Sequence, residues 1–247
     1  MSKRTSRLGF VWPGGGAEQD FYGFLEHAAD HIRLYVSCTR VGGTGDNDHD
    51  IKALERTARL DWLVEAARRL ETLNMDCVYW PCTSGSFVMG SHHAKRQVEI
   101  LKTTLGVPAG STSLAYIEAL QRCGFRKVSV LSTYPEPASR TFVSFLNEYG
   151  IEVLSMKWLG APAGWDAALF TPEFIIENIP QAMHTGAEVL LIPDTAMPSL
   201  FAIERFENAA GLPVFTANGV TMWNAIELID GECVINGFGA LFAGQLY

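Results

Sequence analysis

The chain has 247 residues, of which 48% are hydrophobic and 19% are charged, enough for one large domain or two compact halves with a sizeable core. The formal net charge is -8 and no run of Lys or Arg stands out, which argues against nucleic acid and anionic membrane surfaces as partners. No apolar run approaches the ~20 residues that span a bilayer, and the apolar core of the N-terminal segment is too short for a signal peptide. The sequence therefore predicts a cytoplasmic protein.

Short apolar runs alternate with longer amphipathic segments along the whole chain. Strands are predicted at 8–12, 33–38, 76–81, 127–133, 152–158, 188–193 and 213–217. Helices are predicted at 17–31, 51–73, 87–104, 113–123, 136–149, 172–185, 198–209 and 219–229. Apolar strands separated by helices are typical of parallel sheets covered on both faces, so the predicted fold class is α/β.

An internal repeat runs through this pattern. The segment "LGVPAGSTSLAYIEAL" (105–120) resembles "AGLPVFTANGVTMWNAIEL" (210–228). Ahead of each copy, an apolar strand ends in Pro, one reactive residue, Thr and a small residue: "VYWPCTS" in the first copy and "LLIPDTA" in the second. The reactive residue is Cys82 in one copy and Asp194 in the other.

The repeat predicts two pseudo-symmetric halves, each a parallel sheet flanked by helices. The first half is expected to comprise residues 1–112 with 225–247, and the second half residues 113–224. Ligands of parallel α/β sheets bind outside the carboxyl ends of the strands. Cys82 and Asp194 are therefore expected to meet across one cleft between the halves.

The turn at Cys82 has the composition of a reaction centre. A thiol at the start of a helix is expected to have a lowered pKa because unpaired N–H groups point at it. The hydroxyls of Thr83, Ser84 and Ser86 are expected to cradle a substrate carboxylate, which can accept charge as an enediolate. The other four cysteines lie in apolar runs or helices and are interpreted as core residues. The odd total of five cysteines and their spacing favour neither disulfides nor a zinc site.

These residues resemble a known family. The segments "CTSGSFVMG" and "VPAGSTSLAYIEALQRCGFRKVSVLSTY" are similar to the aspartate/glutamate racemase superfamily, in the branch of maleate cis-trans isomerases and arylmalonate decarboxylases. The resemblance extends over nearly the whole chain. It implies two α/β halves with a cleft between them and cofactor-independent chemistry through an enolate or a related intermediate.

The resemblance also implies roles for individual residues. Cys82 matches the first catalytic position, which is a cysteine in racemases and maleate isomerases and a glycine in arylmalonate decarboxylases. The positions implied to bind substrate are Thr83, Ser84, Tyr134, Gly14, Gly15, Ser139, Thr195 and Ala196. Ser139 stands where an asparagine is common, and the glycines replace polar residues of the N-terminal substrate loop.

Asp194 is the largest departure from the family, because relatives usually carry a second cysteine at that position. Racemisation by two cysteines and protonation of a decarboxylation product by the second cysteine are therefore both excluded in that form. An ionised Asp194 would repel a second substrate carboxylate unless it is protonated or paired, which favours a substrate with an amine or a neutral polar group on that side.

Other polar clusters are weaker candidates. His92 and His93 are adjacent on a predicted helix and cannot share a face, so no metal site is predicted there. The segment "GGTGDNDHD" (42–50) lacks the spacing of a Ca²⁺ loop and is interpreted as a flexible loop that covers the site. No nucleotide-binding motif is present, and no cofactor is predicted.

The preferred function is a cofactor-independent isomerase or racemase-type enzyme for a small carboxylate or an amino-acid derivative, with Cys82 and Asp194 as catalytic residues. A carbon–carbon lyase of the arylmalonate decarboxylase type is the first alternative. A two-lobed protein that binds a carboxylate without chemistry is the second alternative. The predicted partner is the small carboxylate itself, and a homo-oligomer is left open.

Overall fold

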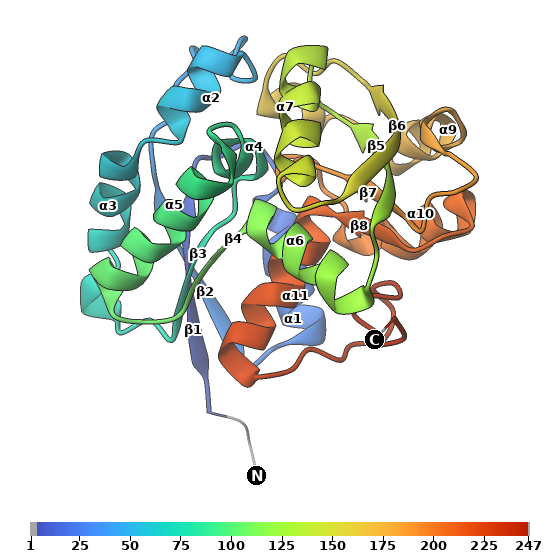
Figure 1. The fold of residues 1–247 in the computed structure, drawn as a ribbon. Helices are drawn as coiled ribbons and strands as arrows, with labels where there is room; N and C mark the ends of the chain where they lie inside the picture. Colours follow the sequence, from blue (N-terminus) through green and yellow to red (C-terminus); the bar gives the residue numbers. More distant parts are fainter. Residues whose placement is uncertain (1–3, 247) are drawn as a thin grey trace.

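The structure, a computed structural model, describes residues 4–246 and consists of two α/β halves, each built on a four-stranded parallel sheet (Figure 1). The first sheet has the order β2-β1-β3-β4, and its strands are β1 (Ser6–Trp12), β2 (Ile32–Cys38), β3 (Cys77–Trp80) and β4 (Ala109–Ser111). The second sheet has the order β6-β5-β7-β8, and its strands are β5 (Lys127–Ser132), β6 (Glu152–Trp158), β7 (Val189–Ile192) and β8 (Val214–Thr216). The two orders are equivalent, so the predicted fold class is confirmed.

Helices cover both faces of each sheet. They are α1 (Glu18–Ala28), α2 (Ile51–Thr57), α3 (Leu60–Arg68), α4 (Thr83–Phe87), α5 (Gly90–Leu105), α6 (Thr112–Cys123), α7 (Glu136–Asn147), α8 (Gly164–Ala168), α9 (Pro172–Ala182), α10 (Ile203–Ala210) and α11 (Ala217–Asp230), with short 3₁₀ turns at Glu71–Leu73 and Leu200–Ala202. Within residues 4–246, no helix is both long and apolar enough to cross a membrane.

The strands alternate their side chains between two apolar layers, as the period of two in a strand requires. Tyr79 in β3 and Leu191 in β7 face a central core that both halves share. Trp80 in β3 faces an outer core under α3 and α5, and Ile192 in β7 faces another under α9 and α10. The strands are buried on both faces, which is why they read as continuous apolar runs.

Helices α6 and α11 pack against each other between the two sheets (Figure 1). The hydroxyls of Thr112 on α6 and Thr221 on α11 lie 2.7 Å apart. The Tyr116 hydroxyl of α6 donates to the carbonyl of Ile192 at the end of β7 over 2.7 Å. The hydrogen bond from Tyr116 ties the end of β7 to the helix that follows β4. The predicted domain boundaries fall at the start of α6 and inside α11, and they stay predictions.

The single helix predicted at 51–73 is wrong. The chain breaks between α2 and α3, where Arg59 is extended with φ -63° and ψ 130°. The carbonyl of Ala58, freed by the break, accepts hydrogen bonds from Nε2 of His93 at 2.9 Å and from Nε2 of Gln97 at 3.0 Å. Contacts with α5 thus replace the helical hydrogen bonds that the extended residue interrupts.

Strand β4 was missing from the predicted strands, because Ala, Gly and Ser have little β propensity. Its glycine, Gly110, is required by packing: a Cβ there would lie 2.3 Å from Cε2 of Tyr79. The Tyr79 ring covers this glycine, and its hydroxyl donates to Oδ1 of Asn224 on α11 at 2.9 Å. The short strand therefore forms through tertiary contacts that no local sequence pattern reports.

Candidate active site

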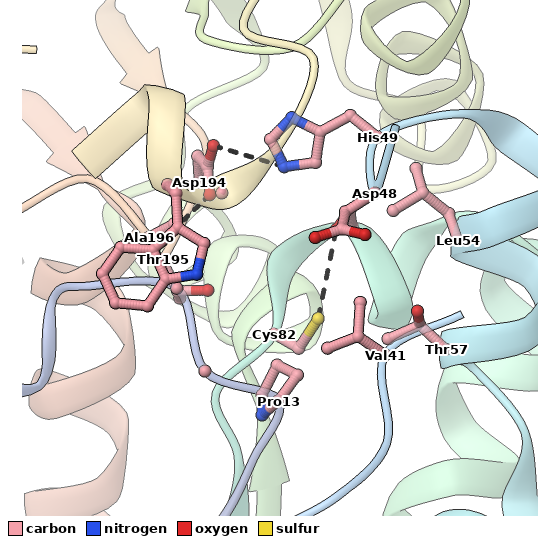
Figure 2. A pocket seen from close by; sticks show the side chains of 15 residues that line it. Pro13, Val41, Asp48, His49, Leu54, Thr57, Cys82, Asp194, Thr195 and Ala196 are labelled. Carbon is pink, nitrogen blue, oxygen red and sulfur yellow. Dashed lines mark hydrogen bonds and ion pairs between the residues drawn. The ribbon is translucent and has the colours of Figure 1, made fainter. Parts of the chain in front are cut away.

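A pocket of about 230 Å³ lies at the carboxyl ends of the strands and takes its walls from both halves. It is lined by Pro13, Gly14, Gly15, Val41, Asp48, His49, Leu54, Thr57, Cys82, Ser84, Gly164, Trp165, Asp194, Thr195 and Ala196. Figure 2 shows Cys82 on one wall and Asp194 with His49 on another. A cavity of about 150 Å³ holds a benzene molecule, so this pocket has room for a small metabolite.

Cys82 and Asp194 occupy equivalent places in the two halves. Each follows a proline at the end of the third strand of its sheet, Cys82 after β3 and Asp194 after β7. Both side chains are buried and line the pocket. The expectation that they share one cleft therefore agrees with their placement.

Cys82 is the N-cap residue of α4, and its Sγ accepts a hydrogen bond from the Gly85 N–H at 3.3 Å. Its Sγ also lies 3.9 Å from Oγ of Ser84. The expectation of a lowered pKa is wrong in direction: burial raises the pKa of Cys82 to about 12, and the charge of Asp194 adds to the rise. The Gly85 N–H and the Ser84 hydroxyl oppose this increase, but α4 is only five residues long and cannot outweigh burial. Cys82 is therefore a neutral thiol at neutral pH.

Close packing around the sulfur requires a glycine at position 85 of the "CTSGS" turn. A Cβ at this position would lie 2.9 Å from Sγ of Cys82 and 2.8 Å from Cζ2 of Trp80. Only a residue without a side chain allows the N–H to approach the sulfur this closely.

Gly85→Ala is expected to destabilise the fold by about 1–3 kcal/mol through overpacking and to displace the thiol. Urea unfolding and the rate of Cys82 alkylation measure the two effects. Gly23→Ala is the matched control, because a Cβ at this helical glycine meets the Phe201 ring only at 3.4 Å. If Gly85→Ala matches Gly23→Ala in both measurements, the close packing around the sulfur is not what requires glycine.

Hydroxyl groups gather beside Cys82. Ser84 lines the pocket, and Thr83 is fully buried with its hydroxyl beside that of Tyr134. Tyr134 is also buried. Burial raises the pKa of Tyr134 well above its ordinary value, the charges of Asp194 and Cys82 add to the rise, and the Ser84 and Thr83 hydroxyls lower it. The Tyr134 hydroxyl therefore belongs to this group and stays a neutral phenol, which can donate a hydrogen bond to a substrate carboxylate.

Two expected substrate contacts do not reach the pocket. Ser86 Oγ lies 2.7 Å from the carbonyl of Cys82, 2.9 Å from that of Thr83 and 2.6 Å from Oγ of Ser113, so it braces α4 against α6. Ser139 is fully buried, and its Oγ lies 2.8 Å from Oγ of Ser132 and 3.0 Å from the carbonyl of Pro135. Both hydroxyls are used inside the protein, which corrects the expectation that they bind substrate.

The loop after β1 brings glycine backbone to the pocket wall. Gly14 and Gly15 have φ values of 92° and 129°, a region that side-chain-bearing residues rarely adopt. A Cβ on Gly15 would lie 3.0 Å from Cβ of Ala196. The glycines that replace polar residues of the family's loop therefore allow close contact between this loop and the turn after β7.

Asp194 is held in a strained conformation with φ 126°, and Asn74 is the other non-glycine residue of the described chain with positive φ. Such a residue costs about 1–3 kcal/mol and persists only where its surroundings hold it. Its Oδ2 accepts from the Thr133 hydroxyl at 2.7 Å, and its Oδ1 accepts from the Ala196 N–H at 2.9 Å. Burial raises the pKa of Asp194, while His49, Thr133, Ala196 and Tyr134 act in the opposite direction.

His49 was missed by sequence reasoning. The segment 42–50, expected to be a flexible cover, is anchored at its end: the His49 N–H donates to the carbonyl of Pro162 at 2.9 Å, and Nδ1 of His49 lies 2.8 Å from the carbonyl of Ala161. The Nε2 atom is 3.9 Å from Oδ2 of Asp194. A histidine in a polar loop carries no local signal for this role, because its partners belong to the other half.

The arrangement suits proton chemistry. A neutral thiol and a carboxylate stand on different walls of one small pocket, with hydroxyl donors beside the thiol. No Lys or Arg lines the pocket, and residues 4–246 contain no group of three or more His, Cys, Asp or Glu side chains that could hold a metal ion.

Comparisons with known proteins agree with this geometry. The chain is 23% identical to a maleate isomerase of Alcaligenes faecalis over 199 residues, which is 80% of this chain and 79% of the relative. The crystal structure of a maleate isomerase variant from Pseudomonas putida with maleate superposes with a TM-score of 0.87 at 20% identity, covering 97% of this chain and 98% of the other. A maleate cis-trans isomerase of Nocardia farcinica with a covalently bound succinylcysteine intermediate superposes with a TM-score of 0.83 at 17% identity, covering 97% and 98% of the two chains.

The family model described as arylmalonate decarboxylase matches residues 30–242. This match includes the turns that carry both Cys82 and Asp194. The chain therefore belongs to the arylmalonate decarboxylase family.

Proposed function

We propose that this protein is a cofactor-independent isomerase or racemase-type enzyme that acts on a small carboxylate or an amino-acid derivative. The observation that carries the proposal is the placement of Cys82 and Asp194 at equivalent strand ends, facing one pocket of about 230 Å³. A thiol and a carboxylate on different walls can reach opposite faces of one substrate carbon.

In a proton-transfer reaction the two groups start in different states. An ionised Asp194 removes the proton from the carbon next to the substrate carboxylate. The electrons move onto that carboxylate, and the hydroxyls of Ser84, Thr83 and Tyr134 stabilise the resulting enediolate by donating to it. The Cys82 thiol, kept neutral by its raised pKa, donates its proton to the opposite face. The configuration at the carbon is inverted, and the thiolate and the protonated Asp194 then exchange protons with solvent.

A covalent route uses the same groups on a carbon–carbon double bond. The thiol proton of Cys82 passes to Asp194, and the sulfur adds to one carbon of the double bond. Asp194 then returns the proton to the other carbon, which leaves a single bond that can rotate. Reversal of both steps releases the isomer. The succinylcysteine of the Nocardia farcinica relative supports this route.

A carbon–carbon lyase is the second candidate, and the description of the family favours it. In that reaction the substrate loses CO₂, and the Cys82 thiol donates the proton to the carbanion that remains. The choice between the two activities depends on whether the substrate carries two carboxylates on one carbon.

His49 lies beside Asp194 and changes which substrates fit that side of the pocket. Asp194 alone would repel a second substrate carboxylate, but the imidazole 3.9 Å away offsets that charge when it is protonated. We therefore propose both dicarboxylates and amino-acid derivatives as substrates to be tested, with one carboxylate held at Ser84, Thr83 and Tyr134.

The function is tested by incubating the protein with a panel of small carboxylates in D₂O. The panel includes maleate, single enantiomers of amino-acid derivatives and an arylmalonate, and proton NMR follows the products. Geometric isomerisation or inversion with deuterium at the α-carbon supports the isomerase, and CO₂ release supports the lyase. Binding of a carboxylate without exchange, isomerisation or CO₂ release would favour the carboxylate-binding alternative.

A further inference from the structure

His49 and Asp194 form a buried pair whose partners come from the two halves of the molecule. The exposed fractions of the His49 and Asp194 residues are 6% and 3%. The Nε2 atom of His49 and Oδ2 of Asp194 are 3.9 Å apart, and Figure 2 shows the ring directed at the carboxylate. The other groups that act on the carboxylate, which are Thr133, Ala196 and Tyr134, carry no formal charge.

The contact at the opposite side of the ring determines which nitrogen can exchange protons. Nδ1 of His49 lies 2.8 Å from the Ala161 carbonyl. A carbonyl oxygen can only accept, so Nδ1 carries a proton in every state in which this hydrogen bond is kept. Nε2 is therefore the nitrogen that gains or loses a proton, and it is the one that faces Asp194.

The ring is held in place by more than this hydrogen bond. The His49 backbone N–H donates to the Pro162 carbonyl at 2.9 Å. The imidazole packs edge-on against the ring of Tyr134, with 4.6 Å between the ring centroids. A loop that begins in the first half is thus fastened to the second half at the point where the pair forms.

We propose that His49 is a positioning residue that acts through Asp194: its Nε2 faces the carboxylate at 3.9 Å and, when it carries a proton, keeps Asp194 ionised in a buried pocket. The inference rests on the proposed function, because an ionised Asp194 is the base of that reaction. Without a cation nearby, a carboxylate this deeply buried prefers its protonated form. His49 and Asp194 together then take the place of the second cysteine of the relatives.

Three further titratable groups interact with Asp194, and the Asp48 carboxyl, next to His49 in the chain, lines the same pocket. The three groups are Cys82 after β3, Tyr116 on α6 and Tyr134 after β5. Burial raises the pKa of Cys82 to about 12 and raises those of both tyrosines well above 10.0. From acidic to neutral pH these three groups stay neutral, so their charge does not change around Asp194.

The test uses two substitutions that separate charge from anchoring. His49→Asn keeps an amide N–H where Nδ1 donates to Ala161 and removes Nε2. His49→Ala removes both. Protein labelled with ¹³C in the Asp carboxyls is titrated by NMR, and Asp194 is assigned by the resonance missing from Asp194→Asn.

We expect the midpoint of Asp194 to rise by about 1 to 3 pH units in both variants, because an opposite charge within ~4–6 Å shifts a carboxyl pKa by that amount. Where a substrate is available, the acidic limb of kcat/KM should move by the same amount. A midpoint that is unchanged in His49→Asn and shifted only in His49→Ala would mean that His49 anchors the loop and does nothing more, which overturns the proposal.

One measurement on the unmodified chain covers the case in which a variant does not fold. The ¹⁵N shift of Nδ1 in ring-labelled His49 should show a protonated nitrogen at every pH at which the protein is folded. An unprotonated Nδ1 would overturn the proposal. Both readouts are independent of turnover, so a shifted Asp194 in a protein that turns over no carboxylate would refute the proposed function and leave this pair intact.

Discussion

Cys82→Ser is expected to lower kcat about 10⁴-fold, at the upper end of what a single proton-transfer group contributes. A serine hydroxyl fits the turn and can still accept from the Gly85 N–H, but it is a far weaker acid and nucleophile than the thiol it replaces. Substrate binding should persist, because the hydroxyls of Thr83, Ser84 and Tyr134 are unchanged. Steady-state kinetics with any substrate found by the D₂O screen, together with calorimetric binding, measure the two effects.

Cys38→Ser is the matched control for this substitution, because Cys38 is exposed and does not line the pocket. It should retain full activity. Cys82→Ser with a kcat within tenfold of the unmodified protein would contradict a central role for the thiol. Loss of binding together with activity would instead assign Cys82 to substrate recognition.

Asp194→Asn is expected to lower kcat about 10²- to 10⁴-fold with little change in KM, because it removes the base and keeps the shape. The fold should tolerate it. Asn is among the residues that adopt positive φ most readily, its carbonyl can accept from the Ala196 N–H, and its amide can donate to Thr133. Kinetics and thermal unfolding are the measurements.

Asp48→Asn is the control, since Asp48 also lines the pocket and its carboxylate accepts from the Gly45 N–H in its own loop. Its kcat should stay within a few fold of the unmodified protein. A raised KM with unchanged kcat in Asp194→Asn would show that Asp194 binds a substrate amine and moves no proton.

The family and the fold could be predicted because both depend on patterns that repeat along the chain. The strands that become β3 and β7 are apolar at every position and end in the same Pro-x-Thr turn, which placed Cys82 and Asp194 correctly. The family model confirms the predicted resemblance to the branch of maleate isomerases and arylmalonate decarboxylases.

The parts that could not be predicted depend on contacts between distant segments. His49 reaches Asp194 only because its loop is fastened to Ala161 and Pro162 in the other half. The hydroxyl of Ser86 resembles that of Ser84 in sequence, but the neighbouring Ser113 on α6 draws it away from the pocket. Sequence alone does not report such distances.

The direction of the Cys82 pKa could not be predicted for the same reason. A helix start after a cysteine suggests a lowered pKa, but the length of α4 and the depth of burial decide the balance. In the folded chain, burial outweighs the N–H donors, and the nearby Asp194 adds to the rise. The thiol is therefore better suited to donate a proton than to act as a resting thiolate.

Cys82 and Asp194 are expected to act together in one pocket, and the pH dependence of Cys82 alkylation tests this joint action without a substrate. Iodoacetamide labelling, mapped by mass spectrometry, should be slow at Cys82 at neutral pH and should rise only in alkaline solution, while the exposed Cys38 labels first. Because the Asp194 charge raises the pKa of Cys82, the labelling curve should move to lower pH in Asp194→Asn and stay in place in Asp48→Asn. Identical Cys82 curves in the unmodified protein and in Asp194→Asn would show that the two groups do not sense each other, and would contradict their joint action.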